Sequence, residues 1–199
     1  MRRVIVIGGG GHAKVLMNAL QCLVGVKIVG YSDEDPKRVN VKVLGVPMIG
    51  TDRDVGERSP EDVTLVNGIG SVGVSPIRKN VFSAFRDKGF GFETVVHHSV
   101  VKSYDVLMGE GVQIMAGAVI QPGCTIGDNT LINTGASIDH DCVIGDHVHI
   151  APGAVICGGV TVCHGCHVGT GAMIIQGVTI EPDTLVKAGT INTRSRQAL

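Results

Sequence analysis

The sequence predicts two regions of different structural class: a small α/β unit over residues 1–92 and a parallel β-helix over residues 93–199. An apolar strand, a glycine-rich turn and an amphipathic helix open the chain. In the second region, Ile or Val recurs at every sixth position. All six aromatic residues lie at or before Tyr104, so the chain from Asp105 to Leu199 has no aromatic ring to fill a wide core. These observations predict an α/β domain followed by a narrow solenoid.

The first region alternates strands and helices. Residues 4–7 are an apolar run that predicts a strand, and GGGGHAKVLMNALQCL predicts a helix that ends near Gly25. A second helix is expected to be capped by Ser75 and Pro76 and to end at Gly89. Further strands are expected at 27–31, within 64–70 and at 92–96.

The glycine-rich turn has the spacing of a nucleotide-binding loop. Gly8, Gly10 and Ala13 fit G-x-G-x-x-A between a strand and a helix, and Asp33 follows at the end of the next strand. Backbone amides at such a helix start can hold phosphate, and a carboxylate can take ribose hydroxyls. The unit has the size of about half a dinucleotide fold, so a nucleotide diphosphate-sugar fits it better than NAD. The alternative is a turn that only packs helix against strand.

The repeat defines the second region. Each Ile or Val from 114 to 186 is preceded two positions earlier by a small or short residue, which places both on one face of a short strand. The residue before that small one is Gly, Asn, Asp or His in nearly every repeat, the types that adopt positive φ most readily. Each hexapeptide therefore predicts a strand and a turn. With three hexapeptides to a coil, Val95 to Ile191 would form about five coils, roughly 25 Å tall.

Hexapeptides such as VIGDHV and HIAPGA resemble those of the left-handed β-helix acyltransferases, which use acetyl-CoA and work as homotrimers. The left hand is implied by this resemblance alone, because ordinary parallel crossovers are right-handed. With a short Rossmann-like unit in front, the layout resembles the family of sialic acid O-acetyltransferases and bacillosamine (UDP-4-amino-sugar) N-acetyltransferases, over about 190 residues. The resemblance implies an acetyl-CoA-dependent N-acetyltransferase of a nucleotide-linked 4-amino sugar, in bacterial surface glycan biosynthesis.

The same resemblance implies the catalytic and acetyl-CoA-binding residues. His140 falls on the family's general base for direct attack on the thioester, and Asp141 could orient its ring. His149 matches a histidine that contacts acetyl-CoA, and Gly158 matches a glycine whose N–H faces the acetyl carbonyl. His167, eighteen residues and thus one coil beyond His149, is a further candidate for acetyl-CoA binding. The alternative for His140 is a plain surface turn histidine.

Other residues match the family's substrate side. Asn133 corresponds to a substrate-side residue, and the opening loop corresponds to the loop that holds the nucleotide of the amino sugar. The chain departs from the family in its last residues, AGTINTRSRQAL, which replace a Pro-rich tail that walls the CoA channel. Lys187, Arg194 and Arg196 are possible phosphate partners there by charge alone. The matching loop residues are Gly9, Gly10, Gly11, His12 and Asp33.

Composition excludes several classes of partner. A net charge of −1 predicts no binding to nucleic acid, and the absence of a long apolar run predicts no membrane insertion. Six cysteines without a secretion signal are expected to be reduced thiols in a cytoplasmic protein. No metal site is expected, since His149 and His167 alone would supply only two ligands.

Three other functions stay open. One is O-acetylation of sialic acid or a related sugar, which the family also performs. Another is a nucleotide-sugar-binding trimer without catalytic activity, which would bind no acetyl-CoA. The third, an NAD-linked oxidoreductase, ranks last because nothing in the repeat region supplies a nicotinamide site.

Overall fold

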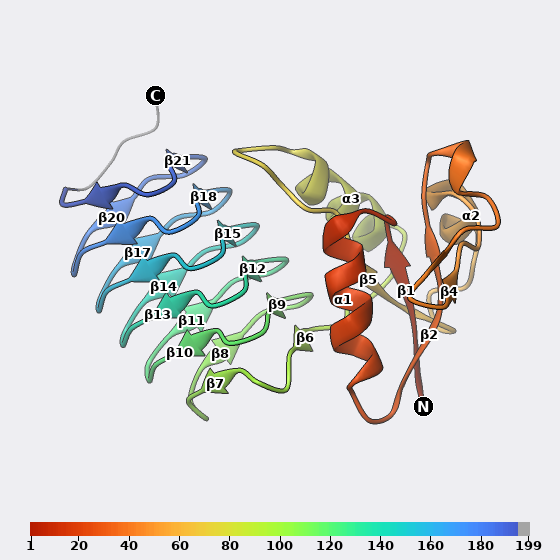
Figure 1. Ribbon diagram of the computed structural model, residues 1–199, viewed down its shortest axis with the longest axis horizontal. Coiled ribbons are helices and arrows are strands. Elements are labelled where there is room, and N and C mark those ends of the chain that lie inside the picture. The colour runs from red at the N-terminus through yellow and green to blue at the C-terminus, as the bar shows by residue number, and fades with distance from the viewer. Residues whose placement is uncertain (195–199) are drawn as a thin grey trace. The chain divides into compact units, whose positions relative to one another are not determined.

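The computed structural model describes residues 1–194 (Figure 1). Its contacts divide the chain into two units. The first comprises Met1–Gly70 and Pro76–Val95, and the second comprises Ser71–Ser75 and the chain from Val96 onward. The predicted division after residue 92 lies close to this one. The assignment of Ser71–Ser75 to the second unit was not predicted.

A three-stranded parallel sheet forms the centre of the first unit, with β1 between the two other strands. Residues Val4 to Ile7 of β1 are fully buried, because a central strand has neighbours on both edges and cover on both faces. Phe82 and Phe85 of the second long helix pack into the same core as Ile5 and Ile7. The elements are β1 (Arg2–Ile7), α1 (Gly11–Gln21), β2 (Val26–Ser32), β5 (Thr64–Asn67) and α3 (Ile77–Asp87).

Two expectations for the first unit were wrong, and one segment carried no expectation. Phe92 makes only an isolated bridge with Leu65, and the strand there is shortened to Val95–Val96. The N-cap of α3 is Pro76, and no side chain caps this helix. Residues 36–56 form elements that are too short for a hydrophobic period to reveal, because each has at most five residues. These are η1 (Pro36–Arg38), β3 (Lys42–Val43), β4 (Val46–Pro47) and α2 (Asp52–Gly56).

The second unit is a parallel β-helix of two-residue strands in three sheets, with partners eighteen positions apart, as in Val119↔Ser137. The first sheet contains β6 (Val95–Val96), β9 (Gln113–Ile114), β12 (Leu131–Ile132), β15 (His149–Ile150), β18 (His167–Val168) and β21 (Leu185–Val186). The second contains β7 (Val101–Lys102), β10 (Val119–Ile120), β13 (Ser137–Ile138), β16 (Val155–Ile156), β19 (Met173–Ile174) and β22 (Ile191–Asn192). The third contains β8 (Leu107–Met108), β11 (Thr125–Ile126), β14 (Val143–Ile144), β17 (Thr161–Val162) and β20 (Thr179–Ile180).

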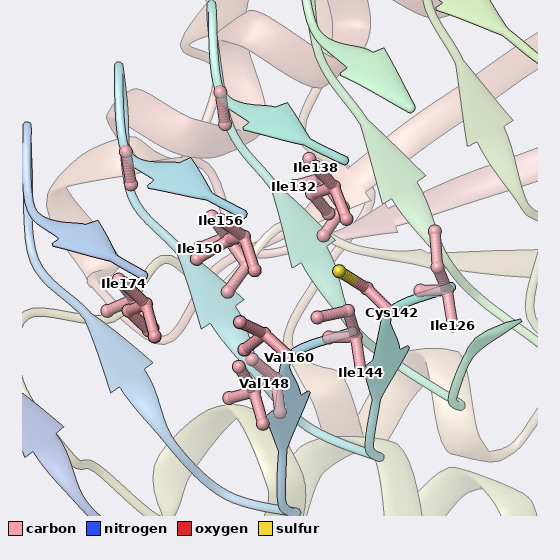
Figure 2. Packing of buried hydrophobic residues seen from close by; sticks show 14 of the residues in the cluster. Ile126, Ile132, Ile138, Cys142, Ile144, Val148, Ile150, Ile156, Val160 and Ile174 are labelled. Carbon is pink, nitrogen blue, oxygen red and sulfur yellow. The ribbon is translucent and has the colours of Figure 1, made fainter. Parts of the chain in front are cut away.

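The interior of the β-helix follows the predicted register. Every Ile or Val of the sixfold series from 114 to 186 is buried, and so are the small residues two positions earlier. Figure 2 shows these side chains gathered inside the coils, with the Cys142 thiol among the isoleucines. The predicted turn positions have positive φ, including four that are not glycine: Asn129, Asp141, His147 and Asp183. The repeat thus fixes both the packing and the corners.

Candidate active site

His140 and Asp141 lie at the corner between β13 and β14. His140 Nδ1 is 2.8 Å from Asp141 Oδ2, and the backbone N–H of His140 donates to Asp139 Oδ1 at 2.8 Å. A carboxylate only accepts, so Nδ1 carries the proton and Nε2 of the neutral ring is an acceptor. The hydrogen bond to Asp141, followed by the charge of Asp139, raises the pKa of His140. Both side chains are exposed, at 61% and 73%.

Gly158 lies one coil beyond His140, directly against the imidazole. A Cβ at position 158 would lie 2.6 Å from His140 Nε2, so any side chain there would displace the imidazole from this place. The backbone of the two coils is joined by a hydrogen bond of 2.9 Å from Gly159 N–H to His140 O. The structure thus brings together the two residues predicted to supply the base and the oxyanion donor.

His149 is held at both ring nitrogens. Asn133 Oδ1 accepts from the backbone N–H of Thr134 at 2.8 Å, which fixes the amide so that Nδ2 faces His149 Nε2 at 3.2 Å. Because that amide donates, Nε2 accepts and Nδ1 carries the proton, which points to Ser71 Oγ at 2.8 Å. His149 is 7% exposed. Asn133, predicted to bind the sugar substrate, and His149, predicted to bind acetyl-CoA, are therefore direct neighbours. The contact of Ser71 with His149 was not predicted from the sequence.

His167 packs on His149 from the adjacent strand of the same sheet. The two rings meet edge to face with centroids 4.6 Å apart, as β15 and β18 pair in register. Burial lowers the pKa of His167, and among the described residues its Nδ1 atom has no hydrogen-bond partner. The neutral imidazole is therefore the favoured form at this position.

The glycine loop of the first unit borders a cavity of about 330 Å³. Gly10 is the N-cap of α1, and a Cβ at Gly10 or Gly11 would meet nothing within 4 Å, so the loop leaves space on its open side. Gly9 differs, because a Cβ there would lie 2.5 Å from the Tyr31 ring. The lining residues are Gly8, Gly9, Gly10, Gly11, His12, Asp33, Glu34, Asp52, Gly68, Ile69 and Gly70.

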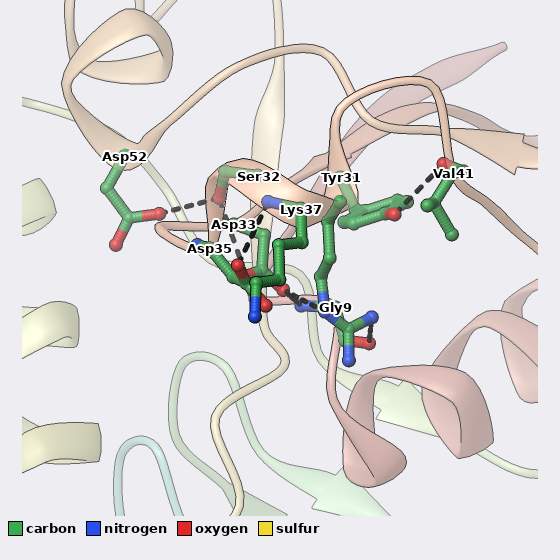
Figure 3. Close-up of polar contacts among 10 residues, drawn as sticks. Gly9, Tyr31, Ser32, Asp33, Asp35, Lys37, Val41 and Asp52 are labelled. Carbon is green, nitrogen blue, oxygen red and sulfur yellow. Dashed lines mark hydrogen bonds and ion pairs between the residues drawn. The ribbon is translucent and has the colours of Figure 1, made fainter.

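Asp33 lines this cavity together with the glycine loop, and its carboxylate is already engaged within the protein (Figure 3). Its Oδ2 accepts from the backbone N–H of Gly9 at 3.1 Å and pairs with Arg38 Nε at 3.2 Å, and its Oδ1 accepts from the N–H of Asp35. Arg38 also donates to Gly9 O at 2.7 Å. Asp33 and Arg38 therefore clamp the glycine loop in place. No sequence signal pointed to Arg38.

Two further carboxylates line the cavity and were not predicted. Asp52 Oδ1 accepts from Ser32 Oγ at 2.6 Å, and the Asp52 N–H donates to Glu34 Oε1 at 2.9 Å. Burial raises the pKa of the Asp52 carboxyl, opposed by the Ser32 hydrogen bond and reinforced by the charges of Glu34 and Asp33. Asp52 lies at the start of α2, whose Thr51–Asp54 capping box is a readable signal for a helix start there.

The remaining predicted residues are peripheral. Lys187 and Arg194 are exposed in and after the last coil, and Arg196 lies outside the described residues. Within residues 1–194, no group of three His, Cys, Asp or Glu side chains is arranged to hold a metal ion. No helix of the described chain is long and apolar enough to cross a membrane.

Two models of known protein families match the chain, one in each of its two parts. Residues 3–85 match the model of the PglD N-terminal domain. Residues 105–140, 123–158 and 141–176 match that of the bacterial transferase hexapeptide (six repeats). No curated protein sequence matches the chain significantly.

Solved structures match over nearly the whole chain. A histidine-to-alanine variant of GDP-perosamine N-acetyltransferase from Caulobacter crescentus, solved with CoA and GDP-perosamine, is 39% identical with a TM-score of 0.87, covering 96% of this chain and 89% of that one. The acetyltransferase domain of PglB from Neisseria gonorrhoeae is 31% identical with a TM-score of 0.86, covering 98% and 93%. WeeI from Acinetobacter baumannii, at 22% identity and a TM-score of 0.78 over 98% and 93%, shares the fold. The chain therefore belongs to the left-handed β-helix, hexapeptide-repeat sugar acetyltransferases that carry a PglD-type N-terminal domain.

Proposed function

We propose that the protein transfers acetyl from acetyl-CoA to the amine of a nucleotide-linked 4-amino sugar, in bacterial surface glycan biosynthesis. The observation that carries the proposal is the His140 ring, with Nδ1 on Asp141 and Nε2 beside Gly158. The related Caulobacter crescentus enzyme is a GDP-perosamine N-acetyltransferase, and the PglB domain of Neisseria gonorrhoeae has been solved with acetyl coenzyme A. The first supports an amine acceptor, and the second supports acetyl-CoA as the donor.

The arrangement supports direct transfer. The sugar amine attacks the thioester carbonyl carbon and a C–N bond forms, while His140 Nε2 takes the proton that the amine loses. Asp141 stabilises the imidazolium that results. The Gly158 N–H is the proposed donor to the oxyanion of the tetrahedral intermediate. When this intermediate collapses, the C–S bond breaks and the CoA thiolate takes up the proton from His140.

Binding roles follow from the other two clusters. We assign the nucleotide to the cavity of the first unit, where Gly9, Gly10, Gly11 and His12 would face phosphate at the start of α1. Asp33 supports this loop through its bond to Gly9. On the β-helix, we assign acetyl-CoA to the surface around the paired rings of His149 and His167, with Asn133 orienting His149.

The enzyme is proposed to act as a cytoplasmic homotrimer. The exposure of His140 and Asp141 supports this, since a base that works in a water-excluded site needs further walls. The outer side of the second sheet carries a mostly apolar series, interrupted by Ser137, that a second copy would cover. Its apolar members are Val101, Val119, Val155, Met173 and Ile191, of which Val101, Met173 and Ile191 are exposed. Acetyl-CoA and nucleotide sugars are cytoplasmic metabolites, which supports the location.

The test is release of CoA thiol from acetyl-CoA with a panel of UDP-, dTDP- and GDP-linked 4-amino sugars. Turnover with at least one member, and none with the matching 4-hydroxy sugars, is expected. Turnover of sialic acid with silence across the amino sugars would establish O-acetylation instead. Nucleotide-sugar binding without any affinity for CoA in calorimetry would identify a binding protein.

A further inference from the structure

Arg78 is a buried cation beside the nucleotide cavity. It is the second residue of α3 and is 4% exposed. Its Nη1 donates to two backbone carbonyls, those of Asn67 and Ile69, both at 2.9 Å. In return the Asn67 side-chain amide donates to Arg78 O at 2.9 Å, and Asn67 Oδ1 accepts from the Ile69 N–H at 3.2 Å. The turn after β5 is thus tied to the start of α3 from behind.

That turn forms one wall of the cavity. Gly68, Ile69 and Gly70 line it, as does the glycine loop. The two segments are in close contact, since a Cβ at Gly8 would lie 2.8 Å from Ile69 Cδ1, and one at Gly70 would lie 3.2 Å from His12 Cβ. A displacement of the turn would therefore move the wall against the loop. The carbonyl oxygens of Asn67 and Ile69 accept hydrogen bonds from Arg78. These oxygens are therefore directed to the guanidinium and do not repel an anion in the cavity.

The negative charge of the cavity lining also favours a cation nearby when an anionic ligand binds. Among the described residues that line the cavity are three carboxylates, Asp33, Glu34 and Asp52, and no Lys or Arg. A sugar nucleotide brings two further negative charges with its diphosphate. Burial lowers the pKa of Arg78 to about 9, so the guanidinium is still charged at neutral pH. Water screens a buried charge much less than a surface charge, so its attraction reaches through the wall.

We propose that Arg78 is the positioning residue for the diphosphate of the sugar nucleotide. It orients the Asn67–Gly70 turn and places a positive charge behind it. This inference rests on the proposed function, because it takes a nucleotide as the occupant of the cavity.

The test compares Arg78→Lys, Arg78→Met and a control, Lys79→Met, the exposed neighbour on α3. Calorimetry measures the affinities of wild type and variants for GDP against guanosine, UDP against uridine and dTDP against thymidine. For the nucleotide that the wild type binds, Arg78→Met is expected to lower the diphosphate-to-nucleoside affinity ratio by about tenfold, the order of one charge–charge interaction within a protein. Arg78→Lys keeps the positive charge but not the planar set of guanidinium donors, so its affinity ratio should lie between those of wild type and Arg78→Met. Lys79→Met should match wild type.

Kinetics gives a second reading. In Arg78→Met, the KM for the nucleotide sugar should rise by about the factor by which the diphosphate-to-nucleoside affinity ratio falls. The KM for acetyl-CoA should stay within about twofold of wild type. Equal losses of affinity for the nucleoside and the nucleoside diphosphate would leave the ratio unchanged. That result would show a purely structural role for Arg78 and overturn the proposal. If circular dichroism shows that Arg78→Met does not fold, Arg78→Lys decides. A wild type that binds no nucleotide would overturn the proposed function as well, whereas an active wild type with unaffected Arg78 variants would overturn this inference alone.

Discussion

At the residue scale, the proposed chemistry rests on the imidazole of His140, whose Nδ1 is hydrogen-bonded to Asp141 and whose Nε2 can accept a proton. Removing His140 should cost kcat about 10² to 10⁴, the usual contribution of a positioned base. The matched control is His164→Ala, an exposed histidine at the same position of a later hexapeptide. Steady-state kinetics with both substrates saturating gives the comparison. Near-normal turnover by His140→Ala would remove His140 from the role of base.

Asp141 should set the pH dependence. The base works unprotonated, so kcat/KM rises with pH through the pKa of His140, which the Asp141 hydrogen bond raises above its ordinary value. In Asp141→Asn the acidic limb should therefore move to lower pH, and the plateau should fall because the imidazolium loses its partner. Asn also tolerates the positive φ of 57° at this corner. A pH profile of kcat/KM tests this, and an unmoved limb would show that Asp141 does not act on His140.

At the scale of the elements, each two-residue strand of the β-helix has one inward and one outward side chain. In β14, Ile144 is 1% exposed and Val143 is 48% exposed. Ile144→Ala should lower the free energy of unfolding by about 2–5 kcal/mol through lost burial and a cavity between coils. Val143→Ala, the adjacent residue, should change it by about 0.5 kcal/mol or less. Urea denaturation of both variants gives the comparison, and equal effects would contradict the register.

This register was readable from the sequence because a sixfold period repeated over more than seventy residues leaves no other choice of face. The two short strands within 42–47 were not readable, since they pair only with each other and carry no period. The placement of His140 beside Gly158 could be predicted, because stacking brings residues eighteen positions apart together. The contacts of Ser71, Arg38 and Arg78 could not, since each depends on where a loop turns in three dimensions.

At the scale of the whole molecule, the proposed trimer is tested by complementation. If each active site is built from two copies, a mixture of His140→Ala with a variant inactive through a different residue should recover part of the activity when subunits are exchanged. His149→Ala is the natural partner variant, because His149 lies in the first sheet of the β-helix whereas His140 lies at the corner between the second and third sheets. Sedimentation should give the mass of three chains. A monomer with full activity would rule the assembly out.

The central claim is that an amine on a nucleotide sugar receives the acetyl group of acetyl-CoA. Mass spectrometry of the reaction products, with wild type and His140→Ala in parallel, tests it most directly. The account predicts that the sugar nucleotide gains one acetyl group in an alkali-stable amide, formed in step with CoA and lost or greatly slowed with His140→Ala. An alkali-labile ester, or acetyl transfer that proceeds equally well without His140, would contradict it.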